Sequence, residues 1–230
     1  PEISLDNPGV WMKDGRHLLL GCESDPVTYG LGEVSPEGER ERIALLSGAN
    51  SGGKTTLLET LASMILLSHS GLPVPACNAK IGLLDELHIL AKVSGTQSAG
   101  ALERTLNKLA EVLVSSERKI ILADELEAIT EPGAASLILG GLLKSSKSNP
   151  DTNILLVTHI GNSISEVMGG EVRIDGIEAQ GLDENMDLIV DRNPKRNHLA
   201  RSTPELIVRR LASRSKGPTS EIFTSLLQGF

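Results

Sequence analysis

The stretch "GANSGGKTTLLETLA", Gly48 to Ala62, decides the fold of this chain. Its first eight residues satisfy the phosphate-loop pattern G-x-x-x-x-G-K-S/T through Gly48, Gly53, Lys54 and Thr55. The compact apolar run "RIALLSG" precedes the loop, and apolar residues at helical spacing follow it. A buried strand, a glycine-rich loop and a helix in this order predict a P-loop that binds a nucleotide.

Each residue type in this loop suits the binding of ATP and Mg²⁺. Glycines let backbone N–H groups curl around phosphates without Cβ clashes, and the helix N-terminus adds a partial positive charge. Lys54 is expected to reach the β- and γ-phosphates, and Thr55 to hold Mg²⁺. The other predicted nucleotide contacts are Gly48, Asn50, Ser51, Gly52, Gly53 and Thr56.

Two later strands end in polar residues that fit the same site. "KIILADE" places Asp124 and Glu125 at the end of an apolar run, and "ILLVTH" places His159 at the end of another. Asp124 is expected to complete the Mg²⁺ site, and Glu125 to orient and deprotonate the attacking water. His159 is expected to contact the γ-phosphate. Without the P-loop, the acidic pair would be explained equally well as solvated charge at a strand end, and a lone histidine there is more often structural.

Strands that alternate with helices predict an α/β fold with a mainly parallel sheet covered on both faces. The chain is predicted to contain N-terminal strands and turns (1–40), a P-loop ATPase core (41–192) and a C-terminal helical segment (193–230). "AKIGLLDEL" predicts one short or edge strand, and "EVRIDG" and "MDLIVD" two later ones. Helices are expected at Lys54–Ser68, Ser98–Ser115, 131–146, Ser163–Met168, 203–214 and Thr219–Leu227.

Composition restricts the class of protein. At 230 residues and 40% apolar content, the chain can bury one large core, which must be aliphatic because only Trp11, Tyr29, Phe223 and Phe230 are aromatic. No apolar run approaches the roughly 18 residues of a membrane span, and no charged-then-apolar leader opens the chain. The two cysteines match no metal spacing. A cytoplasmic protein without a membrane partner is therefore expected.

Charge is spread unevenly along the chain. The net charge of −8 argues against a broad basic face for nucleic acid. However, residues 192–216 contain one acid, Glu205, and eight basic residues: Arg192, Lys195, Arg196, Arg201, Arg209, Arg210, Arg214 and Lys216. This segment could contact DNA or an acidic face of the same molecule, or it could be the wet side of amphipathic helices.

The P-loop, the acidic pair and the strand-end histidine together form the pattern of ABC-type ATPases. In that superfamily a serine at the start of a helix in a second subunit completes the site. The segment "SGTQSAGALERTL" fits this role, with Ser98 facing the partner's γ-phosphate and Ser94 as the second choice. An ordinary serine N-cap would give the same sequence without a partner.

Several stretches resemble the ATPase domain of the MutS family of DNA mismatch-repair and recombination proteins. "GANSGGKTT" is similar to that family's loop, G-P-N-x-G-G-K-S/T-T, and Asn50 matches its asparagine. "GLPVPA", "SAGALERTLNKLAEVL" with Glu103, "ADELEAITEPGAASL" and "LLVTH" fall on further blocks of the family. "HLARSTPELIVRRLA" is similar to its closing helix-turn-helix segment, which makes dimer contacts. The resemblance covers roughly residues 42–212.

The resemblance implies a homodimer joined through its ATP sites. It also has departures: Ala49 replaces the loop proline, and "LEAITEPGAA" replaces a Gly-Arg-Gly-Thr-Ser run that helps the two subunits communicate. Lys54, Thr55, Asp124 and Glu125 remain, so hydrolysis is expected to persist. The family's DNA clamp has no room in 230 residues. DNA is thus expected to be held by domains or subunits outside this chain.

Three other functions stay open at the level of sequence. Another ABC-class ATPase, such as a transporter subunit or an SMC-type head, is weakened because no full "LSGGQ" appears. A small-molecule P-loop kinase could use Arg209 and Arg210 to close over phosphates. A non-hydrolysing interaction module would bind nucleotide without turnover.

Overall fold

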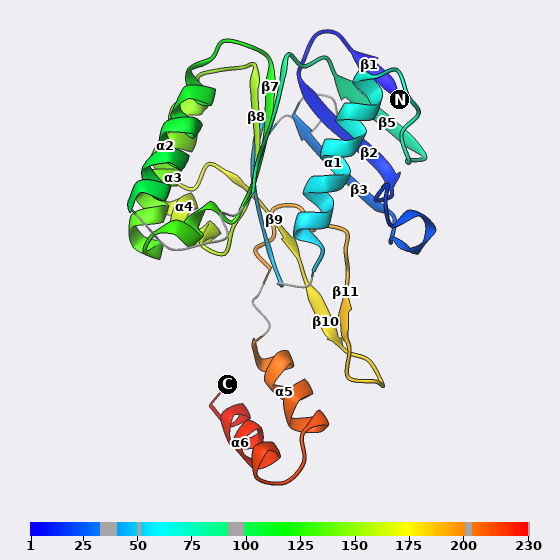
Figure 1. Cartoon of the computed structure of the whole chain (residues 1–230), viewed down its shortest axis with the longest axis vertical. Coiled ribbons are helices and arrows are strands. Elements are labelled where there is room, and N and C mark those ends of the chain that lie inside the picture. The colour runs from blue at the N-terminus through cyan, green and yellow to red at the C-terminus, as the bar shows by residue number, and fades with distance from the viewer. Residues whose placement is uncertain (33–40, 50–51, 92–98, 201–203, 230) are drawn as a thin grey trace.

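The computed structural model describes residues 1–32, 41–49, 52–91, 99–200 and 204–229 (Figure 1). Within them the chain forms a five-stranded sheet with strand order β6-β7-β8-β4-β9, in which each neighbouring pair is parallel. The predicted α/β fold with a mainly parallel sheet is confirmed. The strands are β4 (Ile43–Gly48), β6 (Glu86–Leu90), β7 (Lys119–Asp124), β8 (Thr152–Val157) and β9 (Arg173–Ile177).

Both faces of this sheet are buried. Leu46 and Leu122 point into one apolar cluster, while their neighbours Leu45 and Ile121 point into another. Successive side chains of a strand alternate between faces, so a strand covered on both sides is apolar on both. This explains the continuous aliphatic runs of the three inner strands β7, β8 and β4, whereas the edge strands β6 and β9 also carry polar residues.

Helices and a second sheet provide the two covers (Figure 1). Helix α1 (Lys54–His69) packs on one face together with a four-stranded sheet of order β1-β5-β2-β3. The opposite face carries α2 (Ala99–Val114), α3 (Pro132–Ser146) and α4 (Gly161–Val167). The second sheet consists of β1 (Glu2–Ser4), β2 (Gly9–Gly15), β3 (Val27–Gly32) and β5 (Asn78–Gly82).

Most of the predicted elements are found within one or two residues of their expected bounds, with two exceptions. The segment expected to be a single strand, "AKIGLLDEL", is divided between β5 and β6, which belong to different sheets. The N–H of Leu83 donates to Ser4 O (2.9 Å) and that of Asp85 to Arg118 O (2.8 Å), so the chain passes from one sheet to the other within three residues. The second exception is β10 (Ala179–Leu182), a short glycine-containing strand that the sequence pattern did not predict. It pairs with β11 (Leu188–Val190), one of the predicted strands, as an antiparallel ribbon.

A buried polar cluster joins the two sheets. Asp175 of β9 accepts hydrogen bonds from the Tyr29 hydroxyl of β3 (2.8 Å) and from Arg173 Nε (3.0 Å). Arg173 also donates to Gly30 O (2.9 Å), and its guanidinium lies over the Tyr29 ring. Burial and the Asp175 carboxylate raise the pKa of Tyr29 well above its usual value, so the phenol remains a donor.

The C-terminal helices α5 (Pro204–Arg214) and α6 (Pro218–Leu227) pack mainly on each other and stand apart from the sheets (Figure 1). Neither helix contains a buried residue. Several of their apolar side chains are exposed: Ile207, Leu211, Ile222 and Leu226. None of the described helices has the length and apolarity needed to cross a membrane.

The basic segment around these helices makes ion pairs with acidic residues of the same chain. The pairs are Arg192–Asp25, Lys195–Glu178, Arg196–Glu41, Arg210–Asp187 and Arg214–Asp187. Of the interpretations that the sequence left open for this segment, contact with acidic groups of the same molecule is therefore observed. Arg201 lies outside the described residues.

Replacing Asp175 by alanine is expected to lower the free energy of unfolding by about 3–5 kcal/mol, because it leaves Arg173 buried without its carboxylate. The matched control is Asp187→Ala, which removes a carboxylate paired with two arginines at an exposed site. That change should cost less than about 1 kcal/mol. Urea unfolding of both variants measures the difference, and equal losses would show that the buried cluster does not stabilise the contact between the sheets.

Candidate nucleotide-binding site

The predicted phosphate loop lies between β4 and α1. Gly53 caps α1 with φ 91°, and Gly48 ends β4 with φ 139°, both in the region that favours glycine. A Cβ on Gly48 would lie 2.2 Å from Ile177 O, so β9 leaves no room for a side chain there. The N–H of Gly52 donates to Ala49 O (2.9 Å). Asn50 and Ser51 lie outside the described residues.

Lys54 is the first residue of α1, and its side chain is buried against the loop. Its ammonium donates to Gly48 O (2.8 Å) and Ala49 O (3.0 Å). Burial lowers the pKa of Lys54, while the carboxylates of Glu125, Asp124 and Glu127 act in the opposite direction. A cation is therefore positioned among main-chain groups where the predicted phosphates would lie.

Thr55 and Asp124 form a pair suited to a divalent cation. The Thr55 hydroxyl donates to Asp124 Oδ2 (2.7 Å), which joins the start of α1 to the end of β7. Asp124 Oδ1 is buried and has no hydrogen-bond partner among the described residues. Mg²⁺ prefers hard oxygen ligands and usually retains several waters in nucleotide sites, so one hydroxyl and one carboxylate fit it. No cluster of three metal-binding His, Cys, Asp or Glu residues occurs in the part described.

Glu125 and His159 meet at the ends of adjacent strands β7 and β8. His159 Nε2 lies 2.8 Å from Glu125 Oε1. Glu125 adopts the left-handed conformation, with φ 46°, and its N–H donates to Val157 O (3.0 Å). This turn directs the carboxylate away from the strand and toward the imidazole. A non-glycine residue held in this conformation is uncommon and often belongs to a functional site.

Sequence reasoning missed a third carboxylate, that of Glu127. It lies in the short 3-10 turn η2 (Leu126–Ile129) that follows β7. Glu127 Oε1 accepts hydrogen bonds from the Thr158 hydroxyl (2.9 Å) and from the backbone N–H of His159 (2.7 Å). The sequence shows an acidic residue two positions after Glu125. It lies outside any strand or helix pattern, so its position relative to the site could not be predicted.

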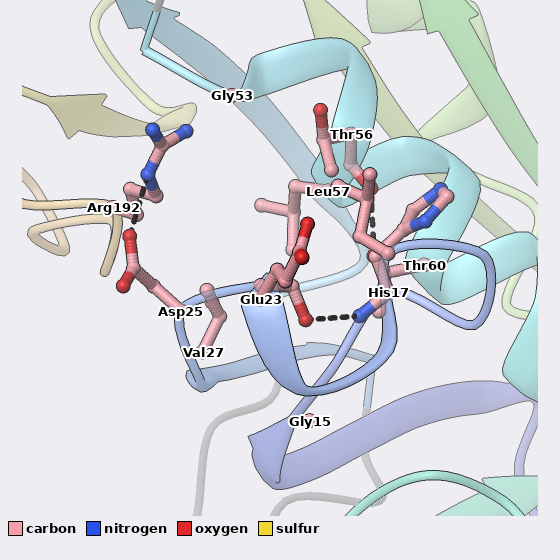
Figure 2. Close-up of a pocket in the computed structure, with 12 residues that line it drawn as sticks. Gly15, His17, Glu23, Asp25, Val27, Gly53, Thr56, Leu57, Thr60 and Arg192 are labelled. Carbon is pink, nitrogen blue, oxygen red and sulfur yellow. Dashed lines mark hydrogen bonds and ion pairs between the residues drawn. The ribbon is translucent and has the colours of Figure 1, made fainter.

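Sequence reasoning also missed a pocket beside the loop (Figure 2). One wall is the start of α1, and the other is the connection between β2 and β3, which includes the 3-10 turn η1 (Gly21–Glu23). Arg192 closes one side through an ion pair with Asp25 (2.7 Å). His17 Nε2 lies 3.2 Å from Glu59 on α1. Further lining residues are Leu20, Val27, Gly53, Thr56, Leu57 and Thr60.

The structure brings together Lys54, Thr55, Asp124, Glu125 and His159 from three separate segments of sequence. Thr56 faces the neighbouring pocket. Ser98 and Ser94, the candidates for completing a partner's site, lie outside the described residues, and α2 begins at Ala99. Their predicted role stays a prediction.

The parallel sheet, the loop before α1 and the polar strand ends define the class: an α/β protein of P-loop NTPase type. Comparison with known proteins then gives the family, although no protein-family model matches. The chain is 42% identical over 233 residues to DNA-binding protein MutS2 of Pyrococcus furiosus, an alignment that covers 100% of this chain and 41% of that protein. It therefore belongs to the MutS family, as a divergent member.

More distant relatives agree with this assignment. Endonuclease MutS2 of Lacticaseibacillus casei is 34% identical over 144 residues, which cover 60% of this chain and 18% of the relative. DNA mismatch repair protein MutS of Christiangramia forsetii is 30% identical over 132 residues, with 55% and 15% covered. The chain thus spans less than half the length of these curated relatives.

Replacing Gly48 by alanine is expected to lower the free energy of unfolding by about 2 kcal/mol or more, because the new methyl group meets the Ile177 carbonyl in a conformation strained for alanine. Gly141→Ala is the control: this helical glycine has open space around its Cβ position, and the change should stabilise α3 by about 0.5–1 kcal/mol. Denaturant unfolding distinguishes the two. A Gly48→Ala variant as stable as the wild type would show that the loop has another conformation available.

Proposed function

We propose that this chain is the ATP-binding and ATP-hydrolysing domain of a MutS-like DNA repair or recombination protein, and that it acts as a nucleotide-driven dimerising switch. The observation that carries the proposal is the convergence of the Thr55–Asp124 and Glu125–His159 pairs around the buried ammonium of Lys54. Such a set combines a phosphate-binding cation, a cation site and a candidate base within one edge of a sheet. The printed names of the relatives, which include a DNA-binding protein and a mismatch repair protein, support the DNA context.

The nucleotide would extend from the phosphate loop into the neighbouring pocket. Gly53 and Thr56 line this pocket at the start of α1, so phosphates held there would bring the nucleoside against Val27 and Leu57. The Arg192 guanidinium at the pocket edge offers a planar surface on which a base can stack. Because the chain contains few aromatic residues, an arginine is proposed to stack on the base in place of an aromatic side chain.

Thr55 and Asp124 would hold Mg²⁺, which when bound supplies positive charge to the β- and γ-phosphate oxygens. Lys54 would exchange its bonds to Gly48 O and Ala49 O for bonds to phosphate oxygens. The exchange preserves the hydrogen bonds of a buried ammonium, so the cation is satisfied in both states. These residues bind and orient the triphosphate and leave the proton chemistry to the strand ends beside them.

Glu125 would act as the general base for hydrolysis. In this step a water oxygen attacks the γ-phosphorus, the bond from that phosphorus to the bridging oxygen of ADP breaks, and the water proton passes to the Glu125 carboxylate. His159 holds that carboxylate through its Nε2 before the reaction. Its place at the end of β8 also allows it to contact the γ-phosphate oxygens.

A second copy of the chain is proposed to complete the site. Ser98 would precede α2 and present its hydroxyl and the helix N-terminus to the partner's γ-phosphate. The exposed apolar side chains of α5 and α6 would add contacts between copies.

DNA would be held mainly outside this chain, because five of the basic residues from 192 to 216 are paired with acids of separate elements. Arg209 and Arg210, the residues of the kinase alternative, pair with Glu205 and Asp187.

Replacing Glu125 by glutamine should preserve ATP binding and lower turnover by about 10²-fold or more, because the amide cannot accept the water proton. Sedimentation velocity with saturating Mg-ATP should then show a stable dimer. Lys54→Ala is the comparison variant and should lose both nucleotide binding and the dimer. A monomeric Glu125→Gln variant would overturn the dimerising switch, and wild-type turnover in that variant would overturn the role of the base.

Filling the pocket separates binding of the nucleoside from binding of the phosphates. Leu20→Trp should weaken ATP binding by about tenfold while leaving inorganic tripolyphosphate binding unchanged, since the indole occupies the space that the base needs. Leu19→Trp is the matched control, because this neighbouring leucine is 87% exposed and does not line the pocket. Isothermal titration with both ligands measures the effect. Equal affinities of the two variants for ATP would place the nucleoside elsewhere.

A further inference from the structure

Glu127 makes contacts that its sequence context does not explain. It lies in the stretch "LEAITEPGAA", where this chain departs from the MutS family pattern. Its Oε1 accepts from the hydroxyl of Thr158, which is fully buried, and from the backbone N–H of His159 at 2.7 Å. Hydrogen bonds to a carboxylate are about twice as strong as those between neutral groups. Glu127 is thus firmly attached to the end of β8.

These bonds complete a closed ring between two strand ends. The backbone N–H of Glu125 donates to Val157 O, the Glu127 carboxylate accepts from the next two residues, and the His159 imidazole returns to the Glu125 carboxylate. One more hydrogen bond extends this network into the following turn: the N–H of Ile160 donates to the Thr158 hydroxyl (3.2 Å). The position of the His159 ring relative to Glu125 therefore depends on where Glu127 holds the His159 backbone.

We propose that Glu127 is a positioning residue for ATP hydrolysis: it fixes the backbone of His159 so that the imidazole orients the Glu125 carboxylate. The proposal rests on the proposed function of Glu125 as the base. Glu127 does not touch the reacting atoms in this scheme; its hydrogen bonds act through Thr158 and His159, and its charge also favours the ammonium form of Lys54. Misplacing a group at a reacting centre by about 1 Å can lower the rate by about 10²-fold. A residue that makes no contact with the reacting atoms can therefore control turnover through the position of one that does.

The second oxygen of the same carboxylate bears on the stability that Glu127 provides. Glu127 Oε2 is buried and has no hydrogen-bond partner among the described residues. A buried polar atom without a partner lowers stability and offsets part of what the two bonds to Oε1 contribute. Truncation of Glu127 leaves the buried Thr158 hydroxyl without its acceptor and should lower the stability of the fold, whereas Glu127→Gln keeps an acceptor and so separates position from stability.

Kinetics of Glu127→Ala, Glu127→Gln and the control Glu131→Ala test the proposal. Glu131 is an exposed glutamate just before α3 whose side chain makes no capping hydrogen bond. Glu127→Ala should lower kcat by about 10–100-fold with KM for ATP changed less than about threefold. Glu127→Gln should retain most of kcat, because its amide oxygen can accept both hydrogen bonds. Glu131→Ala should match the wild type.

The amide resonance of His159 gives a readout that needs no turnover. In a ¹⁵N–¹H spectrum of the nucleotide-free protein, its proton should shift upfield in Glu127→Ala and remain in place in Glu127→Gln. If the resonance shifts but the wild type does not hydrolyse ATP, the proposed function fails while the hydrogen bond stands. If the wild type hydrolyses ATP and Glu127→Ala keeps its kcat, the positioning role is overturned.

Two further outcomes would also overturn the proposal. A Glu127→Ala variant that melts more than about 5 °C below the wild type, with kcat and KM altered together, would show a structural role instead. A Glu127→Gln variant as slow as Glu127→Ala, with the His159 resonance unmoved, would show that charge and not position matters.

Discussion

The parallel pairing of β4, β7 and β8 is the constraint on which the rest of the structure depends. In parallel strands all carboxyl ends meet at one edge, and the burial of both faces leaves that edge as the place for polar groups. Asp124 of β7 is paired with Val157 of β8, so the residues that follow each strand emerge side by side. The Thr55–Asp124 and Glu125–His159 contacts are consequences of this register, and a shift of one strand would separate both pairs.

The same constraint decides how much the sequence could predict. Strands buried on both faces read as aliphatic runs, and the polar residue that ends each run is easy to recognise, which is why Asp124, Glu125 and His159 could be singled out as candidates from the sequence. The P-loop carries its own pattern because the positive φ at Gly48 and Gly53 strongly favours glycine. Apolar residues at helical spacing also located α1 and α2, and Pro204 marked the first turn of α5.

What the sequence could not predict depends on contacts between distant segments. Val27 and Arg192 lie far apart in the sequence but line one pocket. Their segments are brought together by a hydrogen bond between the next residues along the chain, Thr28 and Asn193, which are 165 positions apart. Nothing in either segment alone indicates the other. Glu127 lies in a 3-10 turn, where no period distinguishes a buried side chain from a solvated one. The division of "AKIGLLDEL" between two sheets likewise depends on the backbone partners offered by Ser4 and Arg118.

A further consequence of the register is a direct connection between the P-loop strand and the C-terminal segment. Ser47 precedes Gly48 on β4, and its hydroxyl donates to Asp175 O (3.0 Å) on the adjacent strand β9. The Ser47 hydroxyl oxygen also accepts a hydrogen bond from the backbone N–H of Ala200 (3.1 Å), which lies a few residues before α5. Asp175 in turn holds the second sheet through Tyr29. One buried hydroxyl therefore links the loop, the joint between the sheets and the approach to the C-terminal helices. Since all of these groups are buried, a displacement of the loop strand must move its partners or break hydrogen bonds that water cannot replace.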